Sequence, residues 1–132
     1  MQRPPSDPDT GAAIIGSWEV VVRPDGLDQG FVNLSTFLPG GGLINSVGGQ
    51  TGHGSWAWTG GDNYALTLIL SDLDEAGQET ERSTVMATVT VAADGARVEG
   101  PYVNVITDGA GAETERFAGT AQGVRIRVIP MP

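Results

Sequence analysis

Gly16-Ser17-Trp18 opens the first apolar run of the chain, and Gly123-Val124-Arg125-Ile126-Arg127 is the last such run. In a closed antiparallel barrel the first and last strands are neighbours. Trp18 can therefore lie beneath Arg125, although the two residues come from opposite ends of the sequence. The pair would seal one mouth of the barrel. This pattern predicts a container with one open end and a pocket for a small molecule.

Between these two runs the chain alternates short apolar segments, rich in β-branched residues, with clusters of Gly, Asp, Asn and Pro. Such clusters are typical of tight turns. Two free sheet edges would invite aggregation, and closure removes them. We therefore expect an all-β fold, a single antiparallel up-and-down barrel of eight or nine strands. The predicted strands are residues 18–23, 30–38, 42–47, 54–58, 64–71, 80–92, 97–107, 113–122 and 124–129.

The length of 132 residues fits one domain. Residues 1–9, rich in Pro and Asp, are predicted to form a flexible tail, and residues 10–132 the single barrel domain. Residues 10–15 are predicted to form one short helical turn that leads into the first strand. This turn would plug the mouth of the barrel that Trp18 and Arg125 seal.

One local repeat is visible in the sequence. Gly77-Gln78-Glu79-Thr80-Glu81-Arg82 and Gly111-Ala112-Glu113-Thr114-Glu115-Arg116 both follow Asp-containing turns, so we expect equivalent hairpins at one rim. Their paired glutamates have the strand spacing that a glycosidase could use. Because an arginine adjoins each pair, solvated rim charge is the preferred interpretation.

The composition excludes several classes of partner. Sixteen acidic residues against seven basic ones give a net charge of -9, which disfavours nucleic acid and anionic membrane surfaces. No segment is apolar for long enough to span a membrane as a helix, and no signal peptide is visible, so we expect a cytoplasmic protein. With one histidine and no cysteine, the sequence predicts neither a metal site nor a cofactor.

Gly16-Ser17-Trp18 resembles the Gly-x-Trp signature of the calycins, which include lipocalins and fatty-acid-binding proteins, and Arg125 or Arg127 resembles the arginine that stacks on that tryptophan. Residues 37–41 and 52–56 are similar to a turn and a strand of small bacterial lipocalin-like barrels. The resemblance implies a ligand-binding barrel closed by Trp18 and Arg125. A second, purely architectural resemblance is to allene-oxide-cyclase-like barrels of bacterial biosynthesis.

Three residues are candidates for catalysis: His53, Tyr64 and Asn104. His53 is the only histidine, and its imidazole could act as a general acid or base, because it titrates near neutrality and adjacent glycines admit a ligand. A histidine at the rim, in a Gly-rich turn, is the alternative that we favour. Tyr64 and Asn104 could polarise a carbonyl group.

The candidate ligand-binding residues are mostly aromatic. Trp56 and Trp58 share one strand face and are either ligand walls or core. For residues 30–38 the alternation leaves two inner faces open. We prefer the face that carries Phe31, Asn33 and Phe37 over the one that carries Val32 and Leu34. The other candidates for the lumen are Met86 and Tyr102.

Three functions remain open at this stage. The first is a binding barrel for a small apolar or amphipathic molecule. The second is a cofactor-independent isomerase or cyclase that uses the same lumen. The third is a structural or interaction barrel filled by its own side chains. Apolar residues on the outer strand faces also favour a homodimer or a packed N-terminal segment.

Overall fold

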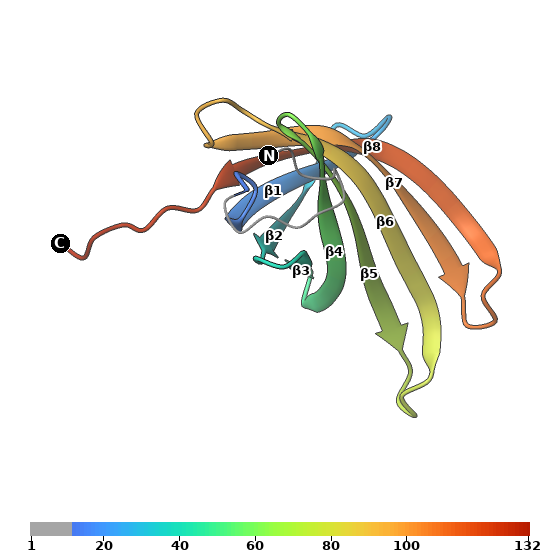
Figure 1. Ribbon diagram of the computed structural model, residues 1–132. Coiled ribbons are helices and arrows are strands. Elements are labelled where there is room, and N and C mark those ends of the chain that lie inside the picture. Colours follow the sequence, from blue (N-terminus) through green and yellow to red (C-terminus); the bar gives the residue numbers. More distant parts are fainter. Residues whose placement is uncertain (1–11) are drawn as a thin grey trace.

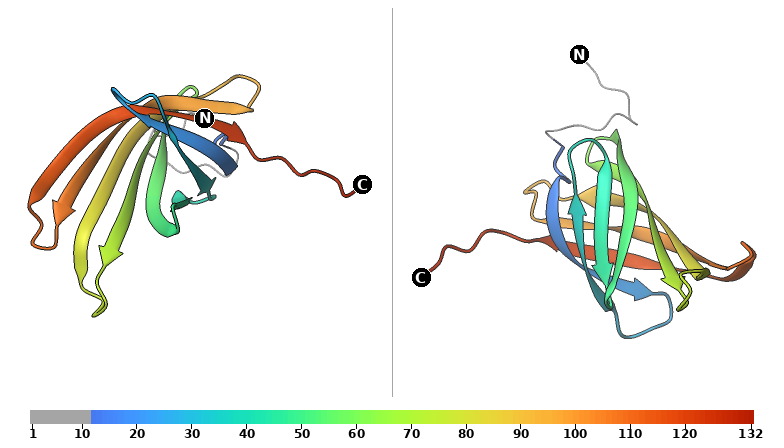
Figure 2. Two further views of the ribbon diagram at one scale, coloured as in Figure 1. Left: turned by 180° about the vertical axis from the view of Figure 1, so that it is seen from behind. Right: turned by 90° about the horizontal axis from the view of Figure 1, so that it is seen from below.

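The computed structural model describes residues 12–132, which form a closed antiparallel β-barrel (Figure 1). The strands follow one another around the barrel in chain order, and β1 closes it by pairing with β8 (Figure 2). This is the up-and-down barrel predicted from the sequence, and it is compatible with a calycin fold. The strands are β1 Gly16–Pro24, β2 Phe31–Phe37, β3 Gly42–Val47, β4 Gln50–Gly60, β5 Asn63–Leu73, β6 Glu79–Val91, β7 Arg97–Asp108 and β8 Glu113–Arg125.

The barrel has eight strands because the predicted run 113–122 continues through Gly123 into the first two residues of the last predicted run, and together they form β8. The prediction of strand at residues 126–129 was wrong, because β8 ends at Arg125. The break expected at Gly123 lies inside that strand, where a Cβ atom would come within 2.7 Å of the Val98 side chain. Close packing against β7, and not a turn, therefore accounts for this glycine. Similarly, β4 begins at Gln50, so the segment around His53 is strand where a Gly-rich turn was expected.

The N-terminal predictions fall partly or wholly outside the described residues. Residues 12–15 form a hydrogen-bonded turn, in which the Ile15 N–H donates to the Ala12 carbonyl at 3.1 Å. The remainder of the predicted helical turn and the predicted tail, residues 1–9, lie outside. Within residues 12–132 no helix is long and apolar enough to cross a membrane.

The N-terminal turn plugs one end of the barrel, which we call the closed end. Ile14 and Trp18 are both 0% exposed, and the Trp18 indole N–H donates to the Ile14 carbonyl at 2.9 Å. Because that N–H is satisfied, the indole can be fully buried without the cost of an unpaired donor. Aromatic and aliphatic side chains surround the pair, among them Phe37, Leu43, Trp56, Tyr64 and Val91.

Arg125 completes the closed end as the sequence predicted. It pairs with Trp18 in the β1–β8 register, and its guanidinium carbon lies 4.2 Å from the indole ring centroid. The guanidinium also donates to the carbonyls of Ile15 and Ala13, and through Nε to that of Gly95 at 2.8 Å. One side chain thus ties β8 to the N-terminal turn and to the β6–β7 turn.

Gly16 is the position that makes this contact fit. Its φ of +128° lies in a region that L side chains rarely adopt. A Cβ atom there would also lie 2.6 Å from a terminal nitrogen of Arg125. Both residues of the Gly-x-Trp pattern therefore contact Arg125: the glycine leaves room for its guanidinium, and the tryptophan stacks against it.

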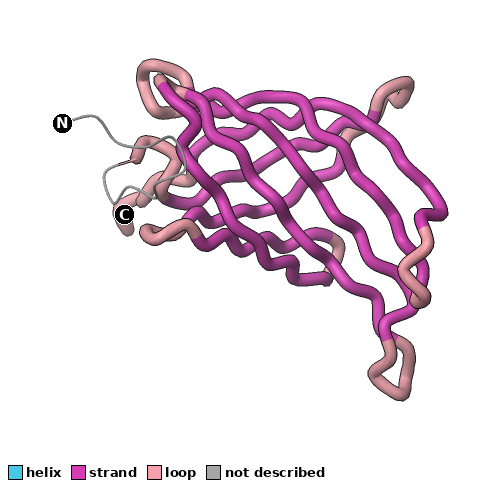
Figure 3. Tube along the Cα trace, turned by 45° about the vertical axis from the view of Figure 1, so that its right-hand side comes forward, coloured by secondary structure: helices cyan, strands magenta, loops and turns pink. Residues whose placement is uncertain are grey.

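At the other end, the open end, two hairpins extend beyond the short strands β2 and β3 (Figures 1 and 3). These β5–β6 and β7–β8 hairpins are the local repeat. Asp74 accepts hydrogen bonds from two backbone N–H groups of its turn, both at 2.9 Å, and Asp108 accepts two at 2.9 and 3.0 Å. The hydroxyls of Thr80 and Thr114 donate to a carbonyl of the preceding strand at 3.3 and 3.4 Å. The two hairpins are built alike, as predicted.

Candidate functional site

The lumen of the barrel holds a partly open cavity of about 230 Å³ between the closed end and the open end. None of the residues that line it, among those that the structure describes, carries a charge. Five of them are polar and the others are apolar. An apolar cavity with a few polar groups is the usual form of a small-molecule site. The polar lining residues are Asn33, Ser35, Asn45, Tyr102 and Asn104.

Strand β2 turns its Phe/Asn face toward the cavity. Phe31, Asn33 and Phe37 line the cavity, as preferred from the sequence, whereas Val32 and Leu34 are 58% and 49% exposed on the outer face. Phe37 also belongs to the buried core, and burying this ring fixes the face of the whole strand, because successive side chains alternate.

Three polar side chains on β2 and β3 form one hydrogen-bonded cluster. The Asn45 amide donates to the Ser35 hydroxyl at 2.8 Å and to the Asn33 side-chain carbonyl at 3.1 Å. Ser35 in turn donates to Asn33 at 3.3 Å. These groups largely satisfy one another, and they stiffen this wall of the cavity.

Tyr102 and Asn104 lie on the inner face of β7 and, unlike the β2–β3 cluster, each has a polar atom without a hydrogen-bond partner within residues 12–132. The Tyr102 hydroxyl and the Asn104 side-chain carbonyl oxygen are buried, and neither has a hydrogen-bond partner among the residues that the structure describes. Tyr102 is only 5% exposed. A buried polar group without a partner costs free energy, so a ligand that supplies the partner gains affinity.

Gly119 makes room for the Tyr102 ring. It faces Tyr102 in the β7–β8 register, and a Cβ atom there would lie 2.7 Å from the phenol oxygen. Burial raises the pKa of the Tyr102 phenol, and the negative charge of Asp25 raises it further. The phenol is therefore uncharged at neutral pH and can donate a hydrogen bond.

Tyr64, Trp56 and Trp58 are placed at the closed end and do not line the cavity. The Tyr64 hydroxyl accepts a hydrogen bond from the Ala13 N–H at 3.2 Å, and its ring meets that of Trp56 edge-on, with centroids 5.8 Å apart. The Trp56 indole donates to the Leu38 carbonyl and the Trp58 indole to that of Gly61, both at 2.9 Å. These contacts show that the three aromatic residues pack and hydrogen-bond at the closed end of the barrel.

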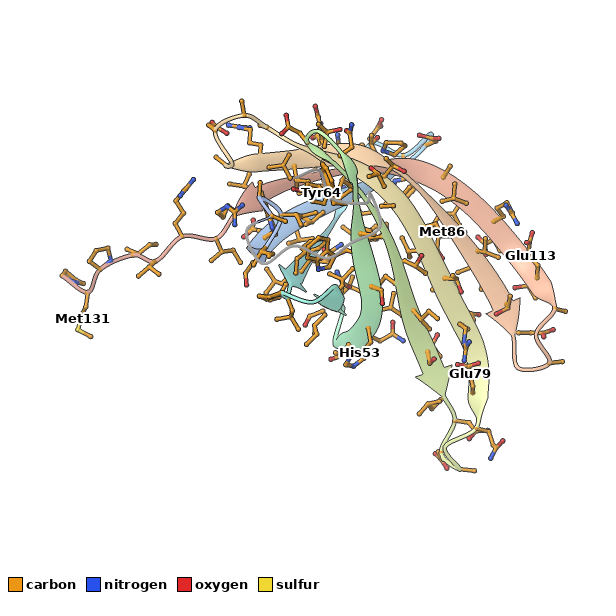
Figure 4. All side chains as sticks on the ribbon, viewed as in Figure 1. His53, Tyr64, Glu79, Met86, Glu113 and Met131 are labelled. Atoms are coloured by element: carbon orange, nitrogen blue, oxygen red, sulfur yellow. The ribbon has the colours of Figure 1, made fainter. Side chains whose placement is uncertain are left out.

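His53 and Met86 point away from the cavity (Figure 4). His53 is exposed and Met86 is 41% exposed. The cause is strand alternation: Val85 and Ala87 line the cavity, so Met86 between them faces outward. Met86, a candidate for the lumen, therefore lies outside it, whereas the exposed position of His53 agrees with the rim alternative that was favoured. Of the three candidate catalytic residues only Asn104 lines the cavity.

Asn45 was not among the residues predicted from the sequence, although it is 3% exposed and central to the polar cluster. Strand alternation could have found it, because Leu43, Asn45 and Val47 share one face of β3 and all line the cavity. A lone asparagine between two aliphatic residues on an inner face is such a signal.

Charged residues lie outside the cavity. Glu79 pairs with Arg82 at 3.1 Å and Glu113 with Arg116 at 2.8 Å, on the two long hairpins. Hydrogen bonds from Ser71 and Arg82 lower the pKa of Glu79, and the contact with Arg116 lowers that of Glu113. Across residues 12–132 no three His, Asp or Glu side chains gather as a metal site would require.

Comparison with known proteins returned no match, whether to family models, to curated proteins or to solved structures.

Proposed function

We propose that this barrel is a lipocalin-like binding protein that holds a small apolar or amphipathic molecule in its lumen. The observation that carries the proposal is the pair of buried, unpartnered polar atoms on Tyr102 and Asn104, which face an otherwise apolar cavity. A barrel of eight strands is wide enough for one small ligand. The Trp18–Arg125 closure leaves the opposite end as the route of entry.

The alternative is a cofactor-independent isomerase or cyclase that uses the same cavity. The uncharged Tyr102 phenol could polarise a carbonyl group in an apolar site. Proton transfer also needs a base, and no carboxylate or imidazole is present among the described residues that line the cavity. Such an enzyme would act by folding its substrate, and this makes binding the simpler proposal.

The cavity also argues against the third hypothesis, a barrel filled by its own side chains.

The test is whether an apolar molecule binds inside the lumen. We suggest naphthalene as the probe, with its affinity measured by equilibrium dialysis. Ala121 lines the cavity, so Ala121→Phe places a ring where the probe would sit, and we expect an affinity loss of at least about tenfold. Ala118 is exposed on the same strand, and Ala118→Phe is the matched control, with unchanged affinity.

A second lumen variant, Ala87→Phe on β6, allows the test to be made even if Ala121→Phe does not fold. Circular dichroism shows which variants fold. The proposal fails if the wild-type protein does not bind naphthalene, or if the folded lumen variants bind it as tightly as the Ala118→Phe control.

A further inference from the structure

The dimensions of the cavity limit the ligand that it can enclose. An apolar cavity of about 150 Å³ holds one benzene molecule. On the same scale, the 230 Å³ of this lumen holds a molecule of about ten non-hydrogen atoms. Two fused rings or a short branched chain are of this size. A long-chain lipid is too large to be enclosed.

The charge of the lumen and its mouth limits the ligand further. No described lining residue is cationic, so a buried carboxylate would have no counter-charge. Asp25 and Asp28 in the β1–β2 turn, with Glu81 and Glu115 on the long hairpins, place four carboxylates at the open end. Its cations include the exposed Arg23 at the end of β1 and Arg116, which pairs with Glu113. The nearby Arg82 is already paired with a carboxylate. This field repels anions, and the uncharged lumen offers nothing to stabilise a buried cation.

The two unpartnered atoms specify the polar part of the ligand. The Asn104 carbonyl oxygen can only accept a hydrogen bond, so its partner must carry an O–H or N–H. Tyr102, two residues along the same inner strand face, can donate or accept. A carboxylate oxygen cannot bond to the Asn104 carbonyl oxygen, because both atoms only accept hydrogen bonds.

Resting on the proposed function, we infer that the lumen selects an uncharged molecule of about ten non-hydrogen atoms that presents a hydroxyl or N–H group to Asn104. Carboxylates of the same size are rejected. The selectivity comes from Asn104 and Tyr102, because the other polar side chains of the cavity largely satisfy one another.

Four probes that share one fused-ring system test this inference: naphthalene, 2-naphthol, 2-methoxynaphthalene and 2-naphthoate, each measured by equilibrium dialysis at neutral pH. We expect 2-naphthol to bind at least about fivefold more tightly than 2-methoxynaphthalene, because only the hydroxyl donates to a buried acceptor. We expect 2-naphthoate to bind at least about tenfold more weakly than 2-naphthol.

Two variants locate the selectivity. Asn104→Leu keeps the size of the side chain and should abolish the preference for 2-naphthol over 2-methoxynaphthalene. Tyr102→Phe should reduce that preference. The matched control is Tyr64→Phe at the closed end, where the hydroxyl is already bonded to the Ala13 N–H, and it should leave the preference unchanged.

The outcomes separate the two proposals. If naphthalene does not bind at all, the proposed function fails and this inference falls with it. If naphthalene binds but 2-naphthol has no advantage, or 2-naphthoate binds as well, only the inference is overturned. A preference that survives Asn104→Leu in a folded protein also overturns it.

Discussion

At the scale of single residues, Arg125 connects more separate segments of the closed end than its neighbours do. It stacks on Trp18 and donates to three carbonyls of two separate turns. Hydrogen bonds from a charged donor and a shielded cation–π contact each contribute of the order of 1–2 kcal/mol. Burial lowers the pKa of the guanidinium, but arginine still remains charged at any physiological pH.

Arg125→Met keeps an unbranched stem over the indole but removes these bonds. We expect it to reduce the free energy of unfolding by about 3 kcal/mol, measured by urea denaturation. Arg127→Met, at an exposed position two residues further on, is the control and should change stability by about 0.5 kcal/mol or less. Equal effects of the two substitutions would show that Arg125 does not hold the closed end.

The residue scale also shows which residues were placed on the correct strand face from the sequence. Phe31, Asn33, Phe37, Tyr102 and Asn104 were proposed for the lumen because they alternate with outward residues on well-marked strands, and all of them line the cavity. The histidine at position 53 was singled out for its chemistry, without a strand register to say where it points. Chemistry alone could not place it, because a shift of one residue reverses the face.

At the scale of elements, the two long hairpins are near copies. Each turn is held by one aspartate that accepts two backbone N–H groups, at Asp74 and at Asp108. Such side-chain bonds fix the turn and the register of its strands. The repeat was recognisable in the sequence because both the turn residues and the Glu-Thr-Glu-Arg segment recur.

We expect Asp74→Ala and Asp108→Ala to destabilise the protein about equally, each by about 1–2 kcal/mol. Asp94 in the β6–β7 turn accepts a bond from Ala96 alone, at 2.9 Å, so Asp94→Ala should cost about half as much. Urea denaturation of the three variants gives the comparison. A larger decrease in the free energy of unfolding for Asp94→Ala than for the other two variants would contradict this account of the turns.

Element boundaries were less predictable than element identity. Gly52 was taken as part of a turn and Gly123 as a break between strands, yet they lie inside β4 and β8. In sequence, a glycine that makes room for a neighbouring strand looks the same as one that ends a strand, because the difference depends on the partner strand.

At the scale of the whole molecule, the closure of the barrel was predictable and its capacity was not. Closure follows from short turns and from the pairing of Trp18 with Arg125 across the chain. Capacity depends on how far the inner side chains fill the lumen, which alternation alone does not determine. The cavity of about 230 Å³ is the structural basis for the proposed binding function.

The most direct test is a crystal structure of the protein soaked with 6-bromo-2-naphthol, in which anomalous scattering locates the bromine. We predict one bromine peak inside the barrel and the hydroxyl within hydrogen-bond distance of the Asn104 side chain. A bromine peak only on the outer surface, with the lumen closed by its own side chains, would contradict the binding function.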